Sequence, residues 1–227
     1  MFVQRGEHGL LLPQLGVQIA RVAPGTAGGT LTLQPDATAG IDALVIESLA
    51  DNNYATLSVF ELHEFTGERE RGLLKFDVSS IAGQTVVSAV LSLWNTALYG
   101  ANYAISLQSI LAANSGWTEA GATWNYAVAS TTRWAGDTGN NGGADAGCSV
   151  SGTDFNATLL GTLNYAQAAA NTEHQVTLVT SQVQSWVDGS NYGIYIRVQD
   201  DFTDSVNWHT SDSATAGFRP KLVIEYS

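Results

Sequence analysis

Short apolar segments separated by glycine, proline, asparagine and serine constrain the fold of this chain most. Each segment has the length of a β-strand, and several alternate apolar with polar residues. In one of them Val87, Ala89, Leu91 and Leu93 share a face, as in a half-buried antiparallel strand. The segments predicted as strands are residues 41–48, 55–64, 72–79, 86–96, 103–111, 174–179, 192–200, 206–211 and 220–227. This spacing predicts an all-β sandwich.

One stretch has a helical period instead. Val179, Val183, Trp186 and Val187 recur at the spacing of an amphipathic helix, and Gly189 follows as a C-terminal stop. A single short helix among strands predicts a lid over one open end of the sandwich. Long polar segments, above all residues 136–154, are expected to be surface loops, and residues 61–71 are expected to form a solvated, charged hairpin connection.

The charge balance excludes several classes of partner. Lys and Arg total 9 against 21 Asp and Glu, for a net charge of -12, which opposes binding to nucleic acid or anionic lipid. No apolar run reaches the ~20 residues of a membrane-spanning helix, so a soluble protein is expected. The one cysteine, Cys148, allows no internal disulfide and is interpreted as an incidental loop thiol.

The first thirty residues differ from the rest. Their prolines, glycines and short alternating stretch predict an extended N-terminal arm over residues 1–30, followed by one domain over residues 31–227. A secretory signal is not expected, because polar residues and Pro13 interrupt the apolar stretch. Such an arm can add to another subunit's sheet edge, although a strand of the same sandwich or a loose tail is an equal alternative. The arm residues expected to make contacts are Val17, Ile19, Arg21 and Val22.

The segment SGWTEAGATWNY, residues 115–126, carries two tryptophans around one glutamate. Trp117, Glu119, Trp124 and Asn125 are chemically suited to a sugar site, since aromatic faces and carboxylates or amides bind sugars. The competing interpretation is that the indoles anchor an irregular loop on the core while Glu119 bonds backbone amides.

Four segments in order, RGLLKFDVSSIAGQTVVSAVLSLWN, GWTEAGATWN, VTLVTSQVQSWVDGSNYGIYI and FRPKLVIEY, resemble the DNRLRE (disaggregatase-related) domain family. The resemblance runs from about Leu33 to Tyr226. It implies a jelly-roll β-sandwich similar to carbohydrate-binding modules, found in surface proteins and phage structural proteins, and it implies no catalysis. It also implies that the tryptophan segment belongs to the scaffold.

The predicted scaffold residues are therefore Trp117, Glu119, Trp124, Trp186, Asp212 and Arg219, with Asp212 and Arg219 expected to form an ion pair. A glycan ligand is expected to be neutral, because a uronate polymer would require a basic groove. The candidate glycan contacts are Trp134, Arg133, Tyr126 and Tyr165.

No cofactor or metal site is predicted, and no catalytic motif is present, so the chain is not expected to be an enzyme. The four histidines are too scattered for zinc. A structural calcium ion is kept as an alternative, since loop oxygens are plentiful. These come from Asp36, Asp42, Asp51, Asn52, Asp200, Asp201 and Asp204.

Three functions remain open at this point. The preferred prediction is a structural or adhesive protein of an extracellular or viral assembly, and specifically a capsid decoration or tail component on a phage virion surface. Its arm would contact other copies of the chain or a capsid or tail protein. The alternatives are a carbohydrate-binding module that recognises a neutral glycan, which would be extracellular or on a cell surface, and a polysaccharide-cleaving enzyme.

Overall fold

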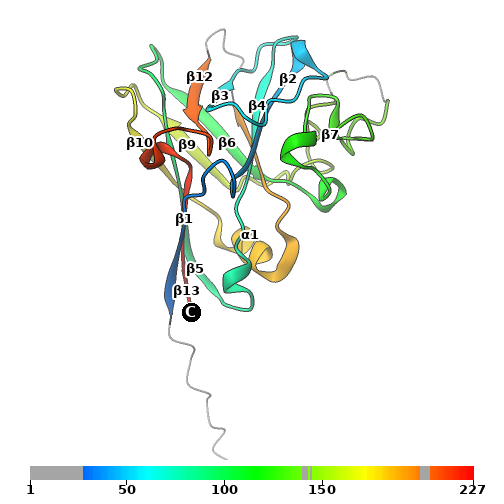
Figure 1. Ribbon diagram of the computed structural model, residues 1–227. Helices are drawn as coiled ribbons and strands as arrows, with labels where there is room; N and C mark the ends of the chain where they lie inside the picture. The colour runs from blue at the N-terminus through cyan, green and yellow to red at the C-terminus, as the bar shows by residue number, and fades with distance from the viewer. Residues whose placement is uncertain (1–27, 140–142, 144, 200–204) are drawn as a thin grey trace, which may run out of the picture.

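Antiparallel strands dominate the part of the chain that the structure, a computed structural model, describes: residues 28–139, 143, 145–199 and 205–227 (Figure 1). One sheet has the order β1 (Gly29–Leu33), β13 (Lys221–Tyr226), β5 (Val86–Trp94), β10 (Glu173–Thr177). The other has the order β2 (Ile41–Ile46), β4 (Glu70–Lys75), β11 (Ile194–Val198), β6 (Tyr103–Ser109), β9 (Gly161–Tyr165). Two ribbons complete the set, β3 (Val59–Leu62) with β12 (Val206–His209) and β7 (Tyr126–Val128) with β8 (Thr132–Arg133).

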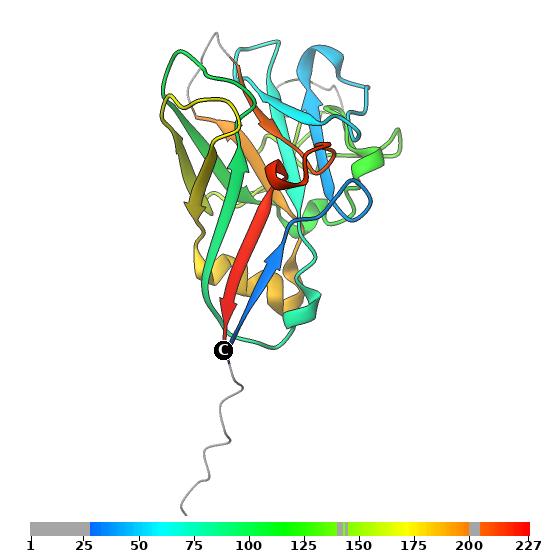
Figure 2. The ribbon, with the colours of Figure 1, turned by 60° about the vertical axis from the view of Figure 1, so that its left-hand side comes forward.

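The two main sheets stack as a jelly-roll sandwich, and the predicted fold class is confirmed (Figures 1 and 2). Every segment predicted as a strand overlaps an observed strand, whereas β1, β7, β8 and β9 were not predicted. β1 starts at Gly29, so the last two residues assigned to the arm belong to the sheet. Arm residues Val17, Ile19, Arg21 and Val22 lie outside the described residues, and their role stays a prediction.

The alternation predicted for β5 is wrong at its first position. Val87 is 57% exposed, whereas Val86 is buried with Ala89 and Leu91. The cause is an irregularity in the pairing with β13, where Glu225 faces Ser88 but the next residue faces Val86. A bulge adds one residue on one side of the ladder and reverses the inward face.

The predicted helix is present but begins one residue after the start of its apolar pattern. It comprises α1 (Thr180–Ser185) and a wider turn, η5 (Trp186–Ser190), in which Gly189 has a φ of 100°. Val179 precedes the helix and is exposed, while Val183 and Trp186 pack into the core. Figures 1 and 2 place the helix near the end of the sandwich where β13 ends, as expected of a lid. The remaining helical turns are η1 (Glu47–Leu49), η2 (Ser79–Ile81), η3 (Ala112–Asn114), η4 (Glu119–Gly121) and η6 (Ala216–Phe218).

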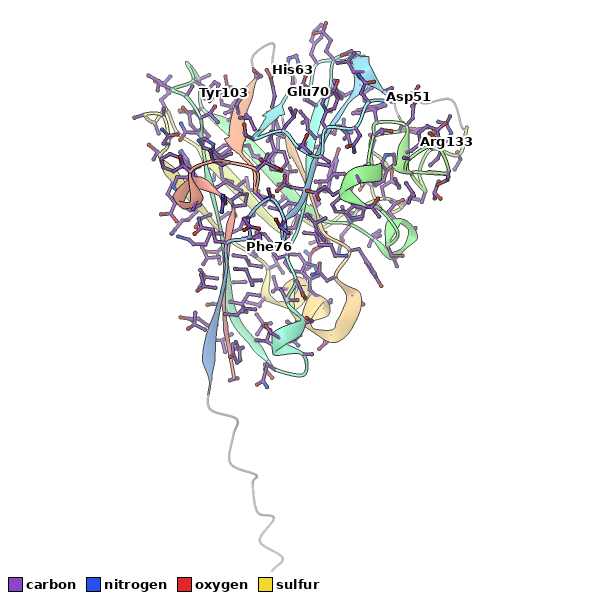
Figure 3. All side chains as sticks on the ribbon, viewed as in Figure 1. Asp51, His63, Glu70, Phe76, Tyr103 and Arg133 are labelled. Carbon is purple, nitrogen blue, oxygen red and sulfur yellow. The ribbon has the colours of Figure 1, made fainter. Side chains whose placement is uncertain are left out.

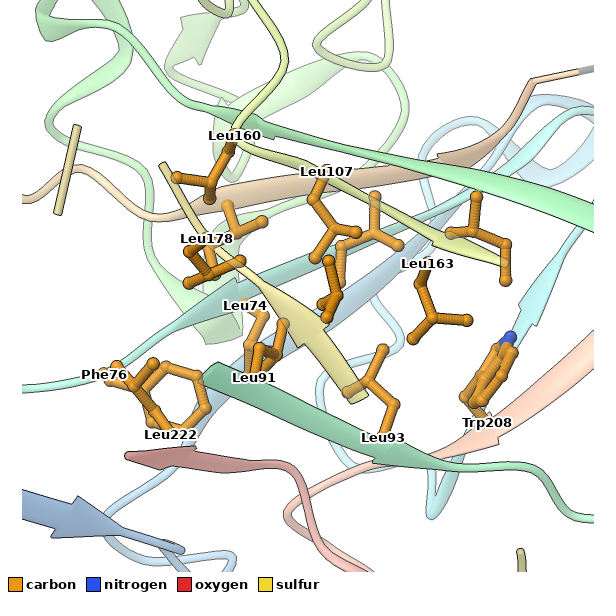
Figure 4. Close-up of a cluster of buried hydrophobic side chains, with 14 of the residues drawn as sticks. Leu74, Phe76, Leu91, Leu93, Leu107, Leu160, Leu163, Leu178, Trp208 and Leu222 are labelled. Carbon is orange, nitrogen blue, oxygen red and sulfur yellow. The ribbon is translucent and has the colours of Figure 1, made fainter. Parts of the chain in front are cut away.

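The main hydrophobic core lies between the sheets (Figure 4). Leu91 and Leu93 of β5 meet Leu107 of β6 and Leu163 of β9 there, all of them buried. Each large apolar side chain that is fully buried contributes roughly 1.5–3 kcal/mol relative to an exposed one. The β3–β12 ribbon connects the layers at one edge, because Asn95 bridges to Trp208 and His63 bridges to Glu70.

A second hydrophobic cluster covers the opposite face of the β2–β4–β11 sheet. Val45, Leu73 and Tyr195 point into it, and Phe155 stacks on Tyr195 with ring centroids 4.6 Å apart. Side chains from the loops and from β7 close it, namely Trp117, Ala122, Trp124, Ala127, Trp134, Ala146, Cys148 and Phe155. Both faces of these strands are buried, which explains why residues 41–46 read as an almost continuous apolar run. The expectation that residues 136–154 form a surface loop is therefore wrong at Asp137, Ala146, Cys148 and Asp154, which are buried.

The charged connection at residues 61–71 is also more buried than expected. Arg71 forms an ion pair with Glu64 at 2.5 Å, and Arg69 forms one with Glu47 at 2.5 Å. Both guanidinium groups lie over the Trp124 ring, at 5.1 and 5.4 Å from its centroid. This connection is thus part of the cover of the second cluster, because it contributes two cations to an aromatic face.

Glu70 provides a pH-dependent prediction. Its side chain lies near His63 at the top of the molecule as drawn (Figure 3). Burial, together with repulsion from the nearby Glu61 and Glu68 carboxylates, raises its pKa from 4.5 to about 7. A carboxyl whose pKa rises on folding favours the folded state at low pH, and this contribution is lost between about pH 4.5 and 7. Glu70→Gln is therefore expected to raise Tm at pH 8 and to have little effect at pH 4.5. Thermal unfolding at both pH values checks this, and an equal shift at the two would contradict it.

In the described part of the chain, no helix is long and apolar enough to cross a membrane.

Candidate functional site

The β7–β8 hairpin brings two predicted glycan contacts together. Tyr126 and Arg133 are paired across the hairpin, and the Arg133 guanidinium lies 4.8 Å from the centre of the Tyr126 ring. Arg133 Nη1 donates a hydrogen bond to Asp137 Oδ2 at 2.8 Å, which raises the pKa of Arg133 and fixes its side chain. Both residues are partly exposed. Because Arg133 is held by both Tyr126 and Asp137, the hairpin presents an aromatic and polar surface whose shape is already fixed.

A cavity of about 290 Å³ lies beside this hairpin and is named here the hairpin groove. Its lining is Asp51, Thr123, Tyr126, Ala129 and Ser130. Figure 3 shows Asp51 and Arg133 on the same side of the molecule, and their charges interact. The groove therefore combines one aromatic ring with a carboxylate and hydroxyl groups.

Local hydrogen bonds hold the groove in shape. Asn125 joins its two sides, since its backbone N donates to Ala50 O at 2.9 Å and its Nδ2 donates to Asp51 Oδ1 at 2.7 Å. Tyr126 N donates to Thr123 Oγ1 at 3.0 Å. Ser130 adopts a φ of 55°, a left-handed turn conformation unusual for serine. Asp51, Thr123 and Ser130 were not among the predicted glycan contacts.

The other two predicted glycan contacts are buried, which corrects their assignment. Trp134 is 1% exposed, and its Nε1 donates to Thr123 O at 2.9 Å beneath the hairpin. Tyr165 is also 1% exposed and packs in the main core, where its ring meets Trp208 edge to face. Neither ring has a free face for a sugar.

The predicted scaffold tryptophans are all buried. Trp117 Nε1 donates to Tyr192 O at 2.6 Å, Trp124 lies in the second cluster, and Trp186 lies in the main core. Glu119 Oε1 accepts a hydrogen bond from the backbone N of Asp42 at 3.3 Å. This is the kind of amide contact expected of Glu119 as a scaffold residue.

The predicted ion pair between Asp212 and Arg219 is absent from the salt bridges of the described residues. Arg219 Nε donates instead to the backbone oxygen of Ser213 in the turn after β12, at 3.0 Å. Arg219 still lowers the pKa of Asp212, but burial dominates and raises it.

Asp42, Glu119 and Asp212 come together in a cluster that we name the carboxylate triad. One carboxylate oxygen from each lies within 4.8 Å of the others. Burial, with smaller contributions from Asp212 and Glu119, raises the pKa of Asp42 from 3.8 to about 6, although the backbone N and the nearby hydroxyl of Ser211 oppose the rise. The triad joins β2, η4 and the turn after β12, and it is the group of described residues best suited to hold a cation. Asp42 was the one member named beforehand among the calcium oxygens.

The remaining calcium candidates that the structure describes do not join it. Asp36 accepts hydrogen bonds from the backbone N atoms of Thr38 and Ala39, and Asp51 lines the hairpin groove. Asn52 Nδ2 donates to the hydroxyl of Tyr54. Asp200, Asp201 and Asp204 lie outside the described residues.

A second cavity, of about 440 Å³, lies beside η5 and is lined mainly by apolar side chains such as Phe76, Val78, Trp186 and Val187. Phe76 and Trp186 are themselves buried. The hairpin groove has the more polar chemistry, which sugar hydroxyls require.

An antiparallel sandwich with a polar groove beside an aromatic hairpin has the features of a ligand-binding module. Residues 34–142 match the model of carbohydrate-binding module family 96. The comparison with curated proteins gives no match. The chain thus contains a domain like those of carbohydrate-binding modules, which in themselves are not catalytic. The DNRLRE resemblance and the virion role go beyond this match and stay predictions.

Proposed function

We propose that this protein is a carbohydrate-binding module that holds a neutral glycan in the hairpin groove. The observation that carries the proposal is the family match, because residues 34–142 include every residue that lines the groove, together with Arg133. Of the alternatives predicted from sequence, it is the one that the comparison supports.

The chemistry of the groove fits a sugar. The ring of Tyr126 can pack against the apolar face of a pyranose, while Asp51 and Ser130 offer an acceptor and a hydroxyl for its hydroxyl groups. A volume of about 290 Å³ suits one or two sugar units, near the lower end of small-molecule sites.

The local charge favours a neutral ligand over an acidic one. Arg133 is the cation at the groove, and it is already paired with Asp137 and close to Asp51. A uronate would meet two carboxylates for one arginine, on a chain of net charge -12.

Tyr126→Ala is expected to weaken binding of a neutral oligosaccharide at least tenfold, because the stacking surface is lost; tenfold corresponds to about 1.4 kcal/mol. A glycan array on the full chain identifies the ligand, and isothermal titration measures Kd. Phe65→Ala is the matched control, since Phe65 is an exposed aromatic residue on the turn between β3 and β4. Unchanged affinity in Tyr126→Ala would exclude the groove, and binding of acidic polysaccharides alone would exclude the neutral ligand.

A further inference from the structure

We propose that the carboxylate triad is a calcium site, formed by Asp42, Glu119 and Asp212 together with the hydroxyl of Ser211. The three carboxylates come from segments far apart in sequence, yet their oxygens lie within 4.8 Å of one another. Carboxylates gathered this closely without a cation repel one another.

Ser211 provides an observation independent of the acidic cluster. Its side chain is 0% exposed, and its Oγ reaches hydrogen-bond geometry with no atom of the described residues. Its backbone N donates to Asp42 Oδ2 at 2.9 Å, and its hydroxyl is close enough to favour the charged form of the same carboxylate. A buried hydroxyl without a well-formed hydrogen bond is unfavourable, whereas its oxygen can serve as a metal ligand.

Asp212 also has a buried oxygen atom, Oδ2, that makes no hydrogen bond with the described residues. The backbone of Gly40 packs directly against Ser211, since a Cβ added at Gly40 would lie 2.2 Å from Ser211 Oγ. Two unsatisfied oxygens thus belong to adjacent residues at the same cluster.

No side-chain cation of the described chain neutralises the triad directly. The salt bridges of the described residues use other carboxylates, those of Glu47, Glu64, Asp137 and Glu173. Arg219 acts on Asp212 only through space, and its Nε is bonded to Ser213 O. An added cation would supply the missing positive charge.

The donor set selects the ion. All four donors are oxygens, which suits calcium or magnesium and disfavours zinc, for which nitrogen and sulfur ligands are typical. Calcium accepts irregular geometry and six to eight oxygens, so carboxylates, a hydroxyl and water can satisfy it, whereas magnesium requires a near-ideal octahedron. Asp42 is 1% exposed, so a sugar ring cannot contact it from solvent. Glu119 and Asp212 are partly exposed and leave a route from solvent.

The test measures calcium itself on the full chain, without a glycan, so its outcome is separate from that of the proposed function. After removal of divalent ions with a chelator, calcium at one hundred times its Kd is expected to raise Tm by roughly 5–10 °C. Titration calorimetry with calcium gives Kd, and magnesium is expected to bind at least tenfold more weakly.

Asp212→Asn and Glu119→Gln are each expected to weaken calcium binding at least tenfold. In chelator, Asp212→Asn is expected to raise Tm, because it relieves repulsion within the triad; with calcium present, it should lower Tm relative to the parent chain. Glu225→Gln is the matched control, because it removes one charge from an exposed position on β13. The proposal is overturned if millimolar calcium neither binds nor shifts Tm, or if Asp212→Asn binds calcium as well as Glu225→Gln.

Discussion

Replacing Asp154 by alanine is expected to lower the free energy of unfolding by roughly 3–6 kcal/mol. Asp154 is 0% exposed, and its carboxylate accepts hydrogen bonds from Asn114 Nδ2, Gly136 N and Val150 N at 2.8, 2.8 and 2.9 Å. Three loop segments are therefore held by one side chain. Alanine leaves the buried donors of Asn114 and Gly136 without this acceptor, at a cost of about 1–3 kcal/mol each, and the partly buried Val150 N at a smaller cost.

Urea unfolding followed by circular dichroism measures this loss. Asp154→Asn keeps one acceptor oxygen, so its cost should fall between those of the parent chain and the alanine variant. Asp145→Ala, an exposed aspartate in the same loop, controls for the lost charge. Equal stability of Asp154→Ala and Asp145→Ala would show that the network does not hold the loops.

Replacing Trp124 by alanine is expected to cost about 3–5 kcal/mol, because it opens a cavity at the centre of the second cluster. The indole is fully buried and lies under Arg69 and Arg71. On another side, a Cβ at Gly147 would lie 2.5 Å from the indole, and the φ of 70° at that position also favours glycine. The surroundings of the Trp124 ring can therefore fill the space left by alanine only in part.

Trp124→Phe separates packing from hydrogen bonding. The indole Nε1 has no hydrogen-bond partner among the described residues, so phenylalanine loses volume but no bond. Its expected cost is below half that of alanine, measured by the same urea titration. A cost equal to that of alanine would mean that the indole nitrogen makes an interaction essential to the cluster.

The sequence predicted the main sandwich because its strands carry a local signal. Alternation and turn residues depend on neighbours within a few positions, and each of the predicted segments overlaps an observed strand. The predicted inward orientation of Val87 was wrong because a bulge depends on the partner strand rather than on β5 itself. β9 was missed because its five residues include a glycine and an asparagine.

The second cluster had no local signal. The loop of residues 136–154 is rich in glycine and polar residues, yet Ala146, Cys148 and Asp154 are buried in it. Their burial depends on Trp124 and Tyr195, which lie elsewhere in the sequence. Long-range contacts of this kind decide which loop covers which face.

The candidate sites likewise divide into residues that are close in sequence, which could be predicted, and residues that are far apart, which could not. Tyr126 and Arg133 are close in sequence and were predicted together, whereas Asp51 enters the hairpin groove from a distant turn. Trp134 adjoins Arg133 but points inward, which composition could not indicate. The carboxylate triad joins residues 42, 119 and 212 and could be recognised only once the chain was folded.

Because Cys148 is buried, its reactivity can report in solution how firmly the loops of the second cluster hold to the sheet. Its thiol is enclosed in the second cluster, and burial, with a contribution from Asp154, raises its pKa well above the ordinary value. A thiol reagent can therefore label this residue only during excursions that expose it. Comparing the labelling rate with that of global unfolding reveals whether the loops detach from the sheet as a separate cooperative unit or melt together with it.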